Sequence, residues 1–194
     1  MGEVVKLERK VREDFTPAVG MAVALAAFGM MFAGLFFVYA GLRVRSDFWP
    51  PPGMPRPPLL LPSANTLVML VSSGTLVHAL RRGRLGDGRG MAQWLGLTVG
   101  LGVAFVALQL LLWRQMMAMG VTMASGGAFA SVLYVLTVLH ALHVAAGVVV
   151  LVRLYLRARR TTAARDTTGL RAGAMFWHFV DLVWVAMFLS MFVF

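Results

Sequence analysis

The sequence contains no cysteine in its 194 residues. This absence excludes disulfide bonds, iron–sulfur clusters, zinc sites with thiolate ligands and heme attached covalently through cysteine. Charged residues are also scarce, at 13% of the chain, whereas a soluble domain carries about a quarter. Because 59% of the residues are hydrophobic, they cannot all be buried in one small core. Lipid must therefore be the solvent for much of the surface.

Negative charge is rarer than positive charge, which leaves a formal net charge of +10. In a soluble protein this excess would suggest a nucleic-acid partner. Here the basic residues lie in short segments between apolar runs. That placement predicts membrane topology and contact with anionic lipid headgroups, and no nucleic-acid partner.

Long apolar runs are abundant, and each is close to or above the ~20 residues that cross a bilayer as a helix. They lie at about 18–42, 60–80, 91–113, 127–156 and 173–194. Only helices satisfy their own backbone groups in lipid, and the alternating pattern of an outer-membrane barrel is absent. The sequence therefore predicts an all-α integral membrane bundle of five transmembrane helices in a single domain, 1–194.

The segments outside the apolar runs predict how the chain is oriented. Residues 1–16 are rich in both charges, and the apolar run after them is too long for the core of a signal peptide, so we expect a retained helix. The segment before the first run and the segment after the second run hold four basic residues each, and the segment after the fourth run, together with Arg153 in the last turn of that run, holds six of the 18. This bias predicts a cytoplasmic N-terminus, which includes 1–16, and a C-terminus outside.

Proline is concentrated in one place, since seven of the eight prolines lie between Pro50 and Pro62. This predicts a stiff, extended loop that ends where the second helix begins. Within the second and third apolar runs, small residues favour close helix packing, among them Ser72, Ser73 and the pair Gly96 and Gly100.

Polar residues inside the membrane are costly and are functional candidates by default. Asp181 is the only carboxylate within the apolar runs. The four histidines, all in or near those runs, are His78, His140, His143 and His178. His140 and His143 are three residues apart and share a helix face, as do His178 and Asp181. Asp181 and His143 lie at similar depth, so they would meet if the last two helices are neighbours.

These polar residues admit three interpretations. Asp181 hydrogen-bonds a histidine or tryptophan and holds the bundle together, or it belongs to a proton relay, or a histidine binds a metal or heme. His140 and His143 lie on one face and cannot both be axial ligands of one heme, which leaves His78 and His178 with one of them. A metal site would need more ligands than the chain supplies. We therefore predict no catalytic, metal-binding or cofactor-binding site in this chain.

Several segments together resemble subunit III of heme–copper respiratory oxidases. The last helix contains Trp177, His178, Phe179, Val180, Asp181 and Trp184 in the spacing WHFVDxVW, which is similar to that family's signature. His140, His143 and Gly147 resemble its HxxHVxxG motif. Pro62, Asn65, Thr66 and the Ser72–Ser73 pair resemble its second-helix segment, and Gln109 follows in the expected order.

The resemblance implies a non-catalytic subunit of a proton-translocating cytochrome c oxidase in the bacterial inner membrane. Such a subunit steadies the catalytic subunit, supports proton uptake and binds phospholipid. Hemes and copper would lie in partners, namely catalytic subunit I and also subunit II, in a hetero-oligomer or a larger supercomplex. The family often carries membrane glutamates where this chain has Phe28 and Leu112, so their roles do not transfer.

Other functions remain open on the sequence. One alternative is an accessory subunit of a quinol oxidase or a nitric oxide reductase. Two others, of a different class, are a small b-type cytochrome that uses His78, His143 and His178 and a small transporter. A transporter would be favoured by an inverted repeat or by broken helices around a polar midplane site, and neither pattern is seen in the sequence.

Overall fold

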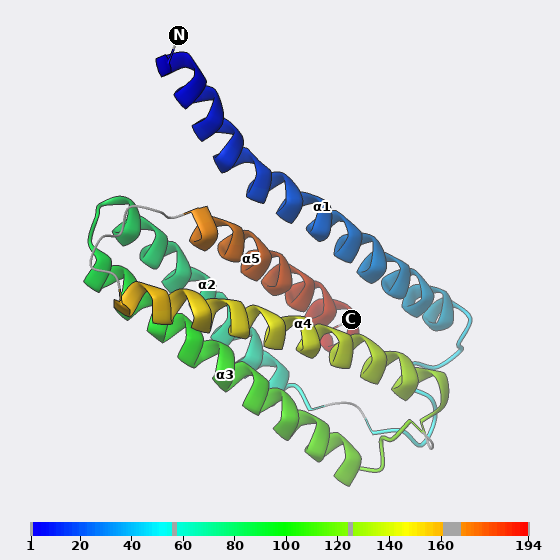
Figure 1. The fold of residues 1–194 in the computed structure, drawn as a ribbon. Helices are drawn as coiled ribbons and strands as arrows, with labels where there is room; N and C mark the ends of the chain where they lie inside the picture. The colour runs from blue at the N-terminus through cyan, green and yellow to red at the C-terminus, as the bar shows by residue number, and fades with distance from the viewer. Residues whose placement is uncertain (1, 56–57, 124–125, 161–167, 194) are drawn as a thin grey trace.

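The computed structural model describes residues 2–55, 58–123, 126–160 and 168–193, with side chains from Val19 onward. Within these ranges every element of regular secondary structure is a helix (Figure 1). The five long helices are α1 (Gly2–Val44), α2 (Leu60–Arg84), α3 (Gly88–Ala118), α4 (Gly127–Arg160) and α5 (Thr168–Phe188). A five-residue π-helical turn, Leu189–Val193, follows α5. All five are long and apolar enough to cross a membrane, so the predicted all-α fold with five such helices is confirmed.

The helices are longer than the apolar runs that predicted them. The apolar part of the first helix, Val19–Val44, matches the expected run, but helical backbone begins at Gly2. The third helix continues to Ala118 and the fifth begins at Thr168, about five residues beyond the predicted limits. Polar residues at helix ends keep their backbone hydrogen bonds outside the apolar zone, so hydropathy underestimates helix length.

Four helices form a closed ring, and the first lies outside it. Contacts join α2 to α3, α3 to α4, α4 to α5 and α5 back to α2. Helix α1 packs on α4 and α5, and its N-terminal part projects beyond the bundle (Figure 1). The ring therefore encloses the core, while α1 covers one of its outer faces.

The turn between α2 and α3 is fixed by backbone geometry and by one side chain. Gly86 has φ +77°, the left-handed conformation that ends many helices. Its N–H donates to Gly83 O, and Asp87 N–H donates to Arg82 O. Asp87 then caps α3 by accepting a hydrogen bond from Gly90 N–H at 2.8 Å. These hydrogen bonds reverse the direction of the chain within three residues and bring α2 and α3 into close contact.

The proline-rich segment is not the extended loop that the sequence predicted. Met54 N–H donates to Pro51 O across a turn in which Gly53 has φ +87°. Trp49 packs edge-on against Phe129 of α4, with ring centroids 5.1 Å apart. The extended-loop prediction was wrong because it used proline stiffness alone and did not include the contact that Trp49 makes with the bundle. Residues 56–57 lie outside the described ranges.

Large side chains from all four ring helices fill the core. The most completely buried include Met69, Phe105, Leu112, Trp177 and Trp184. The core also holds polar side chains: Asn65, Ser72, Thr75, Thr98, Gln109, Thr137, His140 and Asp181 are buried. A membrane protein gains little by burying apolar groups against one another, so specific polar contacts and close packing decide how its helices associate.

Candidate functional site

The two tryptophans of α5 tie that helix to α2. Trp177 Nε1 donates to Ser72 Oγ at 3.0 Å. Two turns further on, Trp184 Nε1 donates to Thr66 Oγ1, also at 3.0 Å. Each hydroxyl also donates a hydrogen bond to a carbonyl of α2. Ser72 Oγ donates to Met69 O, and Thr66 Oγ1 donates to Pro62 O. Every polar atom of these pairs is therefore satisfied without water, as the bilayer interior requires.

Trp177 lies between two glycines on different helices. A Cβ at Gly102 of α3 would approach Trp177 Cη2 to 2.8 Å and Val148 Cγ2 to 2.9 Å. A Cβ at Gly147 of α4 would approach Trp177 Cε3 to 3.0 Å. The indole fills a slot that only residues without a side chain leave open. This explains why glycine stands at position 147 of the sequence motif.

Asp181 and His178 meet a serine of α2. Ser73 Oγ donates to Asp181 Oδ2 at 2.7 Å, and the same oxygen lies 3.0 Å from His178 Nδ1. Asp181 is buried, and its Oδ1 has no hydrogen-bond partner among the residues that the structure describes. The expected contact of Asp181 with a histidine or tryptophan is therefore replaced by a contact with serine, which in turn touches His178.

Two further polar pairs join α2 to α3. Asn65 Nδ2 donates to Gln109 Oε1 at 3.2 Å, in a fully buried position. One end of each amide, Asn65 Oδ1 and Gln109 Nε2, has no partner within the described part of the chain. Thr75 and Thr98 share a hydrogen bond at 2.8 Å. The second-helix residues of the motif thus face α3 as well as α5.

His140 is buried among aromatic rings. Its ring centroid lies 5.4 Å from that of Trp184, 5.9 Å from that of Phe105 and 6.4 Å from that of Phe32. Neither ring nitrogen has a hydrogen-bond partner among the described side chains and backbone. His140 therefore packs between α1, α3 and α5 as an aromatic group.

His143 faces α1, away from Asp181. Its Nδ1 donates to Leu139 O at 2.7 Å, and its ring lies edge-on to Phe28, with centroids 4.7 Å apart. Helices α4 and α5 are neighbours, but Asp181 contacts Ser73 of α2. The contact between His143 and Asp181 that neighbouring helices would allow is therefore not made. Phe28 occupies the place of one family glutamate and meets the histidine through an aromatic contact.

The remaining residues of the sequence motifs lie apart from this network. His78 is exposed and stacks on Trp94 of α3, with centroids 4.9 Å apart. Phe179 faces α1, where its ring lies 3.8 Å from the Cβ position of Gly29. Val180 is buried in the core, and so is Leu112, the place of the second family acid. His78, His143 and His178 thus contact three different helices. In the described ranges, no group of three or more histidine, aspartate or glutamate side chains could hold a metal ion.

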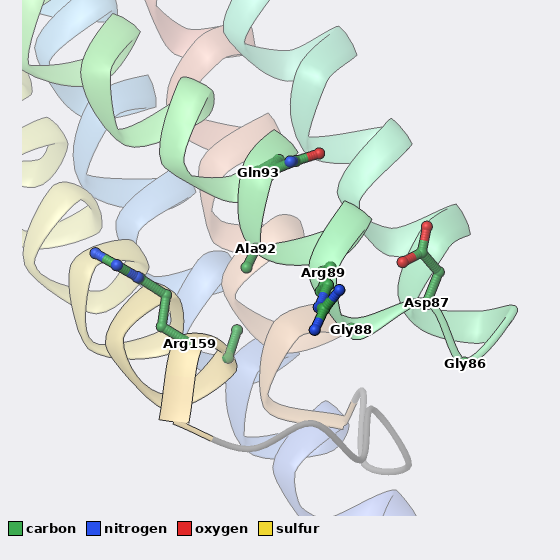
Figure 2. Close-up of a pocket in the computed structure, with 8 residues that line it drawn as sticks. Gly86, Asp87, Gly88, Arg89, Ala92, Gln93 and Arg159 are labelled. Atoms are coloured by element: carbon green, nitrogen blue, oxygen red, sulfur yellow. The ribbon is translucent and has the colours of Figure 1, made fainter.

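Pockets on the surface of the bundle include an apolar groove and a pocket beside two arginines. One, of about 410 Å³, is an apolar groove between α1, α4 and α5 that includes Phe28, His143 and Phe176. The other, of about 680 Å³, lies at the end of the bundle that carries the α2–α3 turn. Figure 2 shows Arg89 on the first turn of α3 and Arg159 on α4 at its two sides.

Sequence reasoning missed Gly102 and the partnership of Ser73 with Asp181. Nothing in the sequence separates Gly102 from Gly100, and yet a Cβ at Gly100 would meet nothing within 4 Å. Trp113 and Thr137 were also missed, although Trp113 Nε1 donates to Thr137 Oγ1 at 3.1 Å. A tryptophan inside an apolar run needs a buried acceptor, and that need is the signal that points to such pairs.

The family model of Cytochrome c oxidase subunit III matches residues 9–194. The chain belongs to the cytochrome c oxidase subunit III family. The match spans all five helices, so it includes the α5 signature, the α4 histidines and the α2 segment. The resemblance that these motifs indicated is therefore confirmed.

Relatives in the subunit III family include several bacterial proteins. The chain is 34% identical to cytochrome c oxidase subunit 3 of Synechocystis sp. over 88% of its own length and 72% of the relative's. It is 31% identical to that of Thermostichus vulcanus, covering 90% and 86%. It is 34% identical to a probable cytochrome c oxidase subunit 3 of Mycobacterium tuberculosis, covering 88% and 84%.

Proposed function

We propose that this chain is the non-catalytic subunit III of a proton-translocating cytochrome c oxidase in the bacterial inner membrane. The hemes and copper would be held by the catalytic subunit I and by subunit II. The observation that carries the proposal is that the two tryptophans of the α5 signature form hydrogen bonds between helices. Trp177 and Trp184 donate their N–H groups to hydroxyls of α2, so the residues of the motif serve helix packing and leave no open ligand set of their own.

The role that fits this construction is to steady the neighbouring catalytic subunit and to support its proton uptake. The ring of α2 to α5 is held by direct side-chain hydrogen bonds, which makes a rigid surface. Asp181, Ser73 and His178 form a short chain of exchangeable protons inside the apolar zone. A carboxylate and an imidazole in contact through a hydroxyl can exchange protons along hydrogen bonds. Proton support is assigned to these residues because Phe28 and Leu112 cannot carry protons.

Phospholipid binding is the second part of the proposal. The apolar groove beside Phe28 suits an acyl chain, since its walls are almost entirely apolar. The pocket between Arg89 and Arg159 suits a phosphate headgroup at the membrane surface. The two pockets are separate sites for two lipids, because one is on the face covered by α1 and the other is at the end of the ring.

The test is a purification of the tagged chain in a mild detergent, followed by a reduced-minus-oxidised spectrum and identification of the proteins that accompany it. We expect a-type heme and a large many-helix subunit with copper. A chain that carries b-type heme by itself would refute the proposal and would point to the histidines as ligands. An o-type spectrum would instead assign the chain to a quinol oxidase. A variant with His78→Ala and His143→Ala is the control, because it leaves only His178 of the three candidate ligands, whereas a heme in a partner keeps its spectrum.

A further inference from the structure

A groove of about 510 Å³ lies on the outer face of the bundle between α2 and α5. Its walls are mostly leucine, valine and alanine, but Ser73, His178 and Asp181 also line it. Helix α1 does not cover this groove, because it packs on α4 and α5 (Figure 1). The one intramembrane carboxylate of the chain therefore lies beside an open face.

The hydrogen bonds at this groove have a definite direction. The single hydroxyl proton of Ser73 goes to Asp181 Oδ2. Ser73 Oγ must then accept in its 3.0 Å contact with His178, so His178 Nδ1 carries a proton and donates it. In a neutral imidazole this tautomer leaves Nε2 as a hydrogen-bond acceptor. Asp181 Oδ1 has no partner among the described residues either, but it is buried, so the acceptor that the groove offers to a neighbour is His178 Nε2.

The depth of these residues limits what can satisfy them. Asp181 lies eight residues after position 173, where the last apolar run begins, or about 12 Å along the helix at the usual rise per residue. That places it near the middle of a hydrocarbon layer of about 30 Å. A lipid headgroup remains at the membrane surface, and an acyl chain has no hydrogen-bond donor. Neither donates a hydrogen bond to His178 Nε2.

We infer that the α2–α5 groove binds a transmembrane helix of a partner subunit, and that this helix presents a hydrogen-bond donor to His178. Suitable donors are a basic side chain, a tryptophan or a hydroxyl. The apolar walls of the groove accommodate the rest of that helix. The inference rests on the proposed function, because the partner is the neighbouring subunit of the oxidase.

The test places a photoreactive residue on this face within the complete complex. Leu182→p-benzoylphenylalanine puts a benzophenone at a groove residue that is 68% exposed. Val103→p-benzoylphenylalanine on α3 is the matched control, since Val103 is 54% exposed. Position 103 is 15 residues from the start of α3, and position 182 is 14 residues from the start of α5. The two probes therefore sit at the same depth on different faces of the ring.

The expected result is a protein adduct from position 182, identified by mass spectrometry as an oxidase subunit, and a lipid adduct from position 103. A lipid adduct from both positions, in a complex with its normal heme spectrum, would overturn the docking inference and leave the proposed function intact. A preparation that contains no heme-bearing partner would refute both the docking inference and the proposed function.

A second measurement tests the polar part of the interface. Ser73→Ala removes the hydroxyl that sets the tautomer of His178, whereas Ser63→Ala changes an exposed serine on the same helix. One interhelical hydrogen bond in a membrane corresponds to about a threefold change in association. We expect Ser73→Ala to lower retention of the heme-bearing subunit in a detergent wash by about that factor, and Ser63→Ala to leave it unchanged. Equal retention in both variants would contradict the role assigned to His178.

Discussion

Trp177 Nε1 lies 3.0 Å from Ser72 Oγ, to which it donates a hydrogen bond across 105 residues of sequence. The indole that makes this bond also fills the slot between Gly102 and Gly147. One side chain of α5 therefore contacts α2, α3 and α4, so the ring closes around Trp177.

The slot makes the two glycines sensitive to a single methyl group. We expect Gly102→Ala to destabilise the protein by about 1–3 kcal/mol, because the new Cβ would overlap Trp177 and Val148. Gly147→Ala should have a smaller effect in the same direction. Gly100→Ala is the control, and it should be neutral or stabilising by up to ~1 kcal/mol through helix propensity. The measurement is thermal unfolding in detergent, and equal midpoints for Gly102→Ala and Gly100→Ala would refute the slot.

The Trp177–Ser72 hydrogen bond can be measured by a double-mutant cycle. We expect Trp177→Phe and Ser72→Ala to be coupled by ~0.6 kcal/mol, the average for such bonds in membranes. Trp177→Phe with Thr66→Ala serves as the comparison, because Thr66 bonds to Trp184 instead. That cycle should show no coupling beyond experimental error. Coupling of the same size in both cycles would mean that general packing, and no specific bond, links α5 to α2.

The buried amide pair predicts an unusual pattern of stabilities. Asn65→Leu or Gln109→Leu alone leaves the other amide without its partner and should cost about 1–3 kcal/mol. The double variant removes both polar groups together, and we expect it to recover most of that loss. Denaturation of the purified chain measures all three variants. Additive losses in the double variant would show that each amide has a further partner outside this chain.

Asp181→Asn separates the structural importance of the carboxylate from the redox centres. The amide oxygen still accepts from Ser73, but the charge is lost. We expect weaker assembly or a shorter lifetime under turnover, with heme spectra unchanged because no heme ligand is altered. Heme content per complex and oxygen consumption over many turnovers are the two measurements. Normal assembly together with unchanged long-term turnover would count against the prediction.

The orientation of the chain is a prediction from its basic residues. Alkaline phosphatase fused at the C-terminal end should be active, since this enzyme folds outside the cytoplasm. The same fusion within residues 81–90 should be inactive. A fluorescent protein that folds only in the cytoplasm should give the opposite pattern at the same two points. Activity of phosphatase at 81–90 would reverse the assignment.

The sequence predicted those parts of the structure that depend on composition along the chain. Runs of apolar residues predicted the five helices, because lipid demands a helix wherever the chain crosses it. The motifs also indicated the subunit III family, which the family match confirms. Contacts between helices were harder to predict from the sequence. Asp181 was expected to meet a histidine or tryptophan, and its partner is Ser73, because helix rotation decides which side chain it faces.

The same limit explains Gly102 and Gly100. Both are glycines on α3, two residues apart, and a helix turns by more than half a circle over that distance. One faces Trp177 and the other faces open space. The period of a helix tells which residues share a face, but only the packed ring tells which face is inward.

The C-terminal end of α1 is attached to the turn that follows α5. Tyr39 Oη donates to Ser190 O, and Arg43 Nη1 donates to the same carbonyl at 3.0 Å. Ser190 lies in the π-helical turn after α5, about 150 positions later in the chain. During synthesis α1 is therefore made before the residues that anchor it, because all four ring helices lie between α1 and Ser190 in the chain. The packing of α1 against the bundle therefore depends on contacts that can form only after α2, α3, α4 and α5 have all been made.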